Sequence, residues 1–342
     1  MLILINRILI VGQGSIGLRH LTIAQKLSPN ADIKTFSRFS QNLNSANGVK
    51  NFDSMHDAIE FKPDIAVIAN PSSMHIDVAT CFAEQGVHLL IEKPISSTSK
   101  NVKKFLKLAK DNNCVILIGY NLRFNNSLKK LKELISDKLV GDIFSIHSCV
   151  GQHLTSWRPT KDYRDSVSSN KNLGGGALLE LSHEIDYLKW IFGDIYSVNS
   201  LVGKNSNLDI DVEDYANLLI KFNKKISDKN HLVATLNMDF FRHNSTRTCE
   251  VIGENGTLIW DGILNTVKYY NPQEKRWVTK FSQKLERNIS YINQWKHFLD
   301  CVNSDNKIEP IISGIDSFNT LKVIEAAKKS SKSGKQELVK EI

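Results

Sequence analysis

The sequence predicts an α/β protein of two domains: an N-terminal doubly wound parallel sheet, and a C-terminal α+β domain with a large, mostly antiparallel sheet. The length predicts the division, because 342 residues with 41% hydrophobic and 23% charged side chains are more than one ordinary core holds. Up to about residue 120, short β-branched runs alternate with helical patterns, as in βαβ units. Beyond residue 122, strands follow one another through polar or glycine-containing turns. We therefore expect domains at residues 1–122 and 123–342, with the last helix able to pack back on the first domain.

In the first domain, apolar runs predict the strands of a parallel sheet at residues 7–11, 32–37, 65–69, 87–91 and 115–119. Between them, apolar residues recur with helical spacing at residues 16–27, 55–61, 75–85 and 99–112. Right-handed crossovers wind such units into an open sheet with helices on both faces.

The second domain is expected to begin with a helix at residues 125–136. Its strands are predicted at residues 142–150, 195–202, 216–222, 232–240, 248–252, 257–260 and 266–270. One helix at residues 177–192 interrupts them, and two more follow at residues 289–303 and 315–331.

The net charge of +8 does not predict a nucleic-acid partner. The densest basic stretch, residues 100–110, interleaves its lysines with apolar residues, the pattern of an amphipathic helix with a solvated lysine face. The excess suits a small anionic ligand, such as a dinucleotide phosphate or an acidic sugar. No apolar run approaches the roughly 18 to 20 residues of a membrane-spanning helix. We interpret residues 1–11 as a buried strand rather than a signal peptide.

The five cysteines are scattered and form no C-x-x-C pair. This pattern fits the reducing cytoplasm, and it argues against a zinc site. We therefore expect a cytoplasmic protein without a bound metal.

A strand that runs directly into G-x-G-x-x-G predicts a dinucleotide-binding turn. Gly12 permits the tight turn, Gly14 lets the backbone approach a pyrophosphate, and Gly17 allows the following helix to pack closely on the strand. The first turn of that helix offers N–H groups and the positive end of its dipole to the phosphates. The expected phosphate-binding residues are Gly12, Gln13, Gly14, Ser15, Ile16 and Gly17.

The end of the second strand favours NADP over NAD. An acidic residue there would bind the ribose 2′-hydroxyl of NAD, but the strand ends without a carboxylate, at Ser37 and Arg38. A hydroxyl followed by a guanidinium suits a 2′-phosphate. NAD remains the alternative, because a loop arginine is often merely solvated.

Glu92-Lys93-Pro94 follows the strand predicted at residues 87–91, at the carboxyl edge of the sheet where ligands of open α/β folds bind. A lysine at this edge can act as an acid or base, or hold a substrate oxygen. Pro94 fixes the backbone locally, either as a trans or as a cis residue.

A second set of reactive side chains follows the glycine run at residues 174–176. Glu180, His183 and Asp186 are spaced by three, which predicts neighbouring positions on one helical face. An imidazole between two carboxylates suits proton transfer and the binding of sugar hydroxyls. A metal site is a poor interpretation, since only one histidine is present. The competing interpretation is a helix whose histidine makes ordinary hydrogen bonds within the protein and whose acidic side chains lie at the surface.

Together these motifs resemble the Gfo/Idh/MocA family of NAD(P)-dependent oxidoreductases, the type of glucose-fructose oxidoreductase and inositol dehydrogenase. The resemblance includes G-x-G-x-x-G at 12–17, Asn70-Pro71 with His75, Glu92-Lys93-Pro94, Asn121 with Arg123, and the helix with His183 and Asp186. It implies that Lys93 and His183 are the proton-transfer and substrate-orienting pair. It also implies that Asn70, Pro71, His75, Glu92 and Lys93 help to bind the cofactor, and that Asn121, Arg123, Glu180 and Asp186 contact the sugar.

The chain departs from the common family pattern at Glu180. Many members carry Asp four positions before the histidine, whereas here Glu180 precedes His183 by three. The segment between residue 151 and the glycine run resembles bacterial members associated with sialic-acid-like and other surface-polysaccharide sugars. An arginine- and tyrosine-rich loop can bind a carboxylate or phosphate of a substrate, with Trp157, Arg158, Tyr163 and Arg164 as candidates. A packed loop anchored by Trp157 is the competing interpretation.

The expected activity is hydride transfer between the nicotinamide of NADP or NAD and a secondary alcohol or ketone of a sugar, a sugar derivative or a cyclitol. Two alternatives remain: an epimerase that recycles a tightly held NAD(P), and a non-catalytic NAD(P)-binding sensor. The large second sheet offers a face with few helices to cover it, so a homodimer or homotetramer is expected, with no nucleic acid or membrane partner.

Overall fold

The computed structural model describes residues 5–37, 48–226, 230–284, 286–304 and 308–339. The chain forms two compact units. The first comprises the stretches Met1–Asn121 and Tyr291–Leu321, and the second comprises Leu122–Ser290 and Lys322–Ile342. Within the described residues, no helix has both the length and the apolar character needed to cross a membrane.

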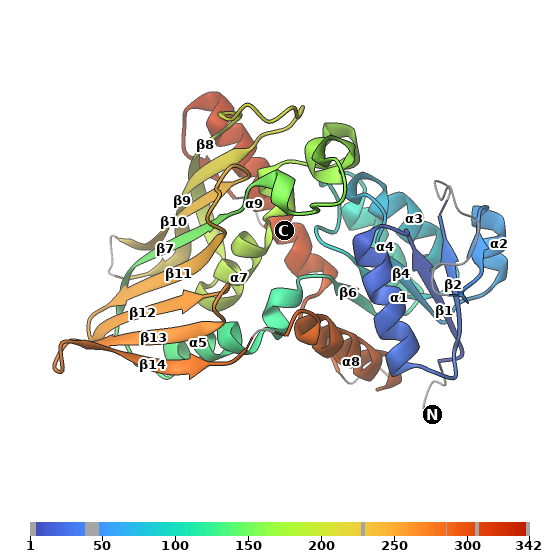
Figure 1. The fold of residues 1–342 in the computed structure, drawn as a ribbon, viewed down its shortest axis with the longest axis horizontal. Helices are drawn as coiled ribbons and strands as arrows, with labels where there is room; N and C mark the ends of the chain where they lie inside the picture. Colours follow the sequence, from blue (N-terminus) through green and yellow to red (C-terminus); the bar gives the residue numbers. More distant parts are fainter. Residues whose placement is uncertain (1–4, 38–47, 227–229, 285, 305–307, 340–342) are drawn as a thin grey trace. The chain divides into compact units, whose positions relative to one another are not determined.

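A six-stranded parallel sheet forms the centre of the first unit, as Figure 1 shows. Its strand order is β3-β2-β1-β4-β5-β6. The strands are β1 (Arg7–Val11), β2 (Asp32–Phe36), β3 (Asn51–Phe52), β4 (Ile65–Ile68), β5 (His88–Ile91) and β6 (Ile116–Ile118). The helices between them are α1 (Ser15–Leu27), α2 (Met55–Glu60), α3 (His75–Ala83) and α4 (Val102–Asp111). The predicted doubly wound parallel sheet is confirmed.

The central strands of this sheet are buried apolar runs, and the order of the strands indicates where a ligand can bind. Every residue of β4, and Ile8 to Val11 of β1, is buried, as expected for central strands covered on both faces. The order reverses between β1 and β4, so their carboxyl ends border the topological switch point, where open α/β sheets bind ligands.

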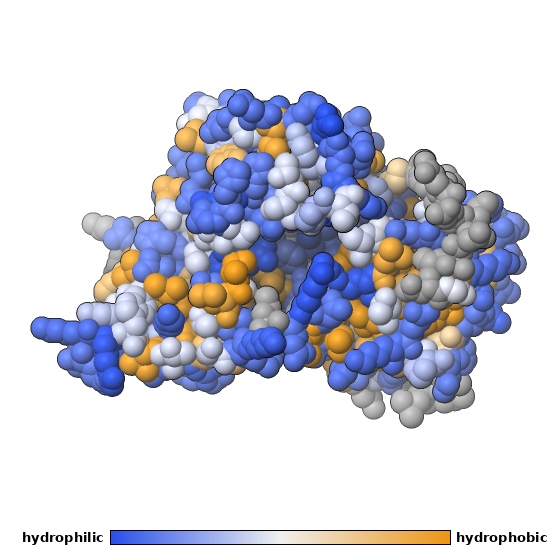
Figure 2. Space-filling model, viewed as in Figure 1, coloured by the Kyte–Doolittle hydropathy of each residue, from blue (hydrophilic) through white to orange (hydrophobic). Residues whose placement is uncertain are grey.

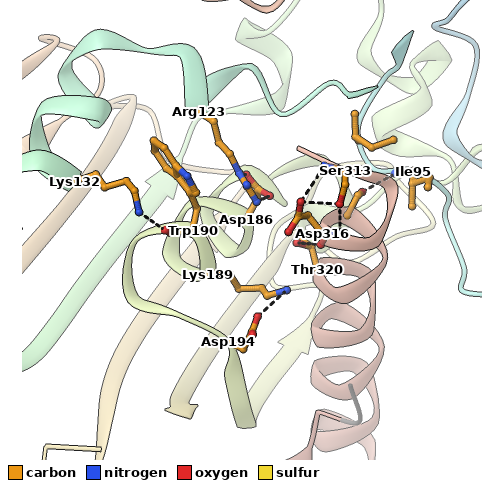
Figure 3. Close-up of polar contacts among 12 residues, drawn as sticks. Ile95, Arg123, Lys132, Asp186, Lys189, Trp190, Asp194, Ser313, Asp316 and Thr320 are labelled. Atoms are coloured by element: carbon orange, nitrogen blue, oxygen red, sulfur yellow. Dashed lines mark hydrogen bonds and ion pairs between the residues drawn. The ribbon is translucent and has the colours of Figure 1, made fainter. Parts of the chain in front are cut away.

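Later segments of the chain complete the first unit. In α8 (Ile289–Asn303), the amide of Gln294 donates to the carbonyl of Ile118 at 3.2 Å. The helix α9 (Gly314–Ser333) begins with a reciprocal cap, in which the Asp316 carboxylate accepts from the main-chain N–H and the hydroxyl of Ser313, at 2.9 and 2.8 Å (Figure 3). The hydroxyl of Ser317 then accepts from the main-chain N–H of Ile95 at 3.2 Å.

A nine-stranded sheet forms the second unit, in the order β14-β13-β12-β11-β7-β10-β9-β8-β15. β7 and β10 are parallel, and the other neighbours are antiparallel, which confirms the predicted mostly antiparallel sheet. The strands are β7 (Ile143–Gly151), β8 (Ile195–Gly203), β9 (Tyr215–Lys225), β10 (His231–Asp239), β11 (Thr246–Gly253), β12 (Gly256–Asp261), β13 (Thr266–Asn271), β14 (Arg276–Ser282) and β15 (Glu337–Leu338).

Helices cover one face of this sheet. α5 (Asn126–Ser136) packs on β12 to β14, and α6 (Ala177–Glu180) packs on β9 and β10. The ring of Tyr187, in α7 (His183–Phe192), meets that of Trp260 at 5.4 Å. The opposite face carries exposed Leu201, Leu219 and Trp277, and Figure 2 shows apolar side chains at the surface over β11 to β13.

The prediction of a single helix at residues 177–192 is wrong. The chain instead forms α6 and α7, with a break at Leu181 and Ser182. The Ser182 hydroxyl donates to the carbonyl of Leu179 at 2.8 Å, a local hydrogen bond that competes with the helical main-chain pattern. The three-residue spacing of Glu180, His183 and Asp186 therefore does not place these side chains on one helical face.

Candidate active site

The glycine turn lies between β1 and α1, at the switch point of the first unit. A Cβ on Gly12 would lie 2.6 Å from the carbonyl oxygen of Ala69, and one on Gly17 would lie 2.0 Å from that of Gly12. Both positions therefore exclude a side chain for reasons of packing. Gly14 differs, because it is exposed and a Cβ there would meet nothing within 4 Å. The space beside Gly14 and the start of α1 is thus open to a ligand, with Ser15 exposed and Ile16 half-buried next to it.

The Gln13 side chain is held by the neighbouring strands. Its amide nitrogen donates to the Thr35 hydroxyl at 2.9 Å and to Oδ1 of the Asn51 side chain at 2.8 Å. Asn51 in turn donates to the main-chain carbonyl of Ser37 at 3.3 Å. These contacts fix the end of β2, beside the half-buried Ser37. Arg38 lies outside the described residues.

The turn after β4 is fixed by His75. Its ring nitrogens lie 2.8 Å from the carbonyl oxygen of Asn70 and 2.9 Å from that of Pro94, so the imidazole joins the ends of β4 and β5. Burial lowers the pKa of His75 below 6.5, against the opposing effect of the two carbonyl contacts. The Oδ1 atom of Asn70 is buried and has no hydrogen-bond partner among the described residues. Pro71 is half-buried at the start of the next turn.

Glu92-Lys93-Pro94 follows β5, and the Lys93–Pro94 peptide bond is cis. The buried Glu92 carboxylate lies 2.8 Å from Nε2 of His20 and accepts the main-chain N–H of Lys93 at 3.1 Å. Burial acts to raise the pKa of Glu92, but the hydrogen bond with His20 and the nearby charges bring it below 4.5. The Glu92 side chain is thus held inside the unit between His20 and the main chain of Lys93, and the Lys93 side chain is half-buried beside it.

In the second unit, two predicted substrate-binding residues bind one another. Arg123 donates to both carboxylate oxygens of Asp186, at 2.9 and 2.7 Å, and both side chains are buried (Figure 3). The guanidinium also lies over the ring of Trp190. Lys132 donates to the main-chain carbonyl of Trp190 at 2.8 Å, and burial lowers the pKa of its amine. Asn121, the last residue of the stretch Met1–Asn121 of the first unit, is buried.

The glycine run lies next to Glu180 and His183. Gly176 has φ +106°, and a Cβ there would lie 2.6 Å from the Glu213 carboxylate, so the tight path requires glycine. Glu180 ends α6 half-buried and accepts the Ser168 hydroxyl at 3.0 Å. His183 begins α7 and is also half-buried.

The predicted substrate loop consists of short 3₁₀ turns between β7 and α6. The indole of Trp157 donates to the carbonyl of Gln152 at 3.1 Å and packs edge-on against Phe240. The Tyr163 hydroxyl accepts the main-chain N–H of Asp209 at 3.1 Å. Arg164 pairs with Asp162 at the surface, and Arg158 is half-buried.

Several buried polar residues near these motifs escaped the sequence analysis. His20 and Asn51 are described above, and the buried Glu184 forms an ion pair with the half-buried Arg247 at 2.8 Å. The helical spacing of the apolar residues could have indicated His20, because it lies on the buried side of α1 together with Leu21 and Ala24. Within the described ranges, no three histidine, cysteine, aspartate or glutamate side chains lie close enough to hold a metal ion.

Two family models match the chain. One, described as an oxidoreductase family with an NAD-binding Rossmann fold, matches residues 6–120, and the other, its C-terminal alpha/beta domain, matches residues 132–340. The chain belongs to the Gfo/Idh/MocA oxidoreductase family.

The rhizopine catabolism protein MocA of Rhizobium meliloti is 31% identical over 194 residues, which are 55% of this chain and 57% of MocA. Levoglucosan dehydrogenase of Pseudarthrobacter phenanthrenivorans is 30% identical over 159 residues, which are 45% of this chain and 40% of that enzyme. The matched part thus spans about half the length of these curated relatives. A solved structure of levoglucosan dehydrogenase in complex with NADH has a TM-score of 0.83 at 19% identity, over 98% of this chain and 100% of that one. At this identity the likeness establishes the fold.

The first unit of this Gfo/Idh/MocA member fits a dinucleotide. Gly14 leaves open the space that a side chain would fill, and the first turn of α1 presents main-chain N–H groups beside it. The Asn70 Oδ1 atom adds a buried acceptor at the end of β4. These groups suit the phosphates and hydroxyls of NAD(P).

Proposed function

We propose that this protein is an NAD(P)-dependent oxidoreductase acting on a secondary alcohol or ketone of a sugar, a sugar derivative or a cyclitol. One observation carries the proposal: β1, β4 and β5 end at one sheet edge with an open glycine turn, Lys93, and a buried Asn70 acceptor that has no hydrogen-bond partner among the described residues. When bound, the nicotinamide supplies or accepts the hydride. In this proposal residues 1–122 bind the dinucleotide and residues 123–342 bind the sugar.

NADP is the proposed preference, because no carboxylate follows β2, where Ser37 and Arg38 stand instead. The family description names NAD and the levoglucosan dehydrogenase structure holds NADH, so these comparisons support a nicotinamide dinucleotide but not the preference for NADP. Separate titrations of the protein with NADPH and with NADH, each followed by the change in its fluorescence on binding, give the two affinities and test the preference. Tighter binding of NADH would reject it.

Lys93 and His183 are the proposed proton-transfer and substrate-orienting residues. A buried or half-buried amine or imidazole can hold the hydroxyl proton during oxidation and return it during reduction. Glu180, Trp157, Arg158, Tyr163 and Arg164 remain proposed sugar contacts, together with Asn121. Asp186 and Arg123 bind one another, so we propose that these two support the site mainly by fixing α7.

The names of the relatives support a carbohydrate substrate, since one is a levoglucosan dehydrogenase and another, from Thermotoga maritima, is a myo-inositol 2-dehydrogenase. We propose a sugar that bears an anionic group, such as a sialic-acid-like or nucleotide-linked sugar, because the loop after β7 carries Arg158 and Arg164. The test is formation of reduced nicotinamide with a panel of neutral, acidic and nucleotide-linked sugars. Cofactor that copurifies without net reduction would instead indicate an epimerase, and binding without any turnover a sensor.

The exposed apolar residues on the open face of the nine-stranded sheet support a homodimer or homotetramer. Light scattering of the purified protein measures its oligomeric state. The variant Leu219→Lys places a charge on the open face and should weaken the association. A monomeric wild type would reject the proposal. A cytoplasmic location remains a prediction from the cysteine pattern.

A further inference from the structure

A chain of hydrogen bonds within the first unit runs from α8 to the main chain of Lys93. The indole N–H of Trp295 donates to Nδ1 of His20 at 2.8 Å. Nε2 of His20 lies 2.8 Å from Oε1 of Glu92, whose Oε2 accepts the N–H of Lys93 at 3.1 Å. Trp295 and His20 are fully buried and Glu92 is 8% exposed, so water does not compete for these bonds.

The chemistry of the partners fixes the direction of each bond. An indole N–H can only donate, so Nδ1 of His20 accepts and its proton resides on Nε2. Nε2 therefore donates to Glu92, and the carboxylate receives two N–H groups, one from His20 and one from Lys93. The ring of Tyr291 packs edge-on against His20 at 6.0 Å, which holds the imidazole in this orientation.

Neighbouring groups leave the Glu92 carboxylate little room to move. A Cβ on Gly119 would lie 2.9 Å from both Cδ and Oε2 of Glu92, so this carboxylate occupies the space that any larger residue at position 119 would need. On the other side of Lys93, the Pro94 carbonyl contacts His75 at 2.9 Å and the Ile95 N–H donates to Ser317 at 3.2 Å. The backbone of Lys93 is thus held on both sides.

We propose that His20, oriented by Trp295, is a positioning residue that acts through Glu92 to fix the backbone of Lys93. Fixing this backbone sets the direction in which the Lys93 amine is presented, and the consequence for proton transfer rests on the proposed function. His20 touches neither reacting group in this account, because Glu92 stands between it and Lys93.

Hydrogen exchange of the Lys93 amide, followed by NMR without any substrate, tests the proposal. In His20→Ala we expect this amide to exchange about tenfold faster, while the amide of Leu90 in β5 keeps its rate. His20→Gln, which can still donate to Glu92, should restore most of the protection. The matched control is His56→Ala, since His56 is exposed on α2 and should leave both rates unchanged.

Trp295→Phe is a milder second variant, because it removes the indole N–H but keeps a ring in the core. It should also accelerate exchange at Lys93, by a smaller factor. Unchanged exchange at Lys93 in both His20→Ala and Trp295→Phe would overturn the proposal, as would equal acceleration at Leu90, which indicates general loosening.

Activity provides the second readout, with the sugar that the wild type oxidises. We expect kcat of His20→Ala to fall about tenfold while the Kd for NADPH stays within about twofold. A parallel loss of kcat and cofactor binding would indicate a merely structural role. If the wild type oxidises no sugar, the proposed function fails, and the exchange rates alone decide the role of His20.

Discussion

The guanidinium of Arg123 binds the carboxylate of Asp186 through two hydrogen bonds, from Nε at 2.9 Å and from a terminal nitrogen at 2.7 Å. Arg123 lies in the turn Asn121–Phe124, and Asp186 lies in the first turn of α7, three residues after His183. Both side chains are almost fully buried. The pair therefore joins the start of the second unit to the helix that carries His183, and it fixes the direction of that helix.

Breaking this pair should destabilise the protein strongly. Arg123→Met leaves the Asp186 carboxylate buried without its counter-charge, which costs about 3–5 kcal/mol of unfolding free energy. Urea unfolding followed by tryptophan fluorescence measures the loss. Arg164→Met, at the surface pair with Asp162, is the control and should leave the unfolding midpoint unchanged. Equal midpoints for Arg123→Met and the wild type would contradict this role.

Alanine substitutions in the glycine turn should separate ligand binding from folding. Gly14→Ala adds a methyl group in open space with φ near −69°, so the thermal midpoint should not change. Its affinity for NADPH should fall about tenfold or more, because the methyl group stands where the pyrophosphate approaches. Gly17→Ala should instead unfold at a lower temperature, since its Cβ would overlap the Gly12 carbonyl. Retained affinity in Gly14→Ala would contradict a phosphate site at this turn.

The stability of the protein should decrease between about pH 7 and pH 5. Burial lowers the pKa of His75 in the folded state below 6.5, so the unfolded chain takes up the proton first as the pH falls. The contribution of neutral His75 is thus fully present above pH 6.5 and is lost at lower pH. His75→Asn should show a shallower dependence of unfolding free energy on pH. The exposed His56→Asn should follow the wild type, and an unchanged slope in His75→Asn would contradict the account.

The sequence predicts most of the first unit, because neighbouring residues along the chain define its strands and its glycine turn. Four buried apolar residues in a row define each of β1 and β4, and the glycine spacing defines the turn between β1 and α1. β3 has only two residues, Asn51 and Phe52, which is too short for any periodicity. The long apolar pattern at residues 177–192 concealed the break at Ser182, since the competing hydrogen bond of a serine hydroxyl leaves the apolar spacing unchanged.

Only part of the candidate site can be predicted from the sequence, because its residues lie in short motifs but their partners do not. Lys93 and His183 belong to short motifs that can be recognised along the chain. The partners of such residues come from distant segments: His20 meets Glu92 from 72 positions away and Trp295 from 275 positions away. Arg123 and Asp186 illustrate the same limit, because sequence motifs name both as substrate contacts while the fold pairs them with each other.

The most direct test of the central claim is the initial rate of nicotinamide reduction with the sugar panel, for the wild type, Lys93→Met and His183→Ala. We expect the wild type to reduce NADP with at least one sugar. Lys93→Met should lose about 100-fold or more in kcat while it still binds NADPH. Undiminished turnover in both variants, or no turnover by the wild type with any sugar and either cofactor, would contradict the account.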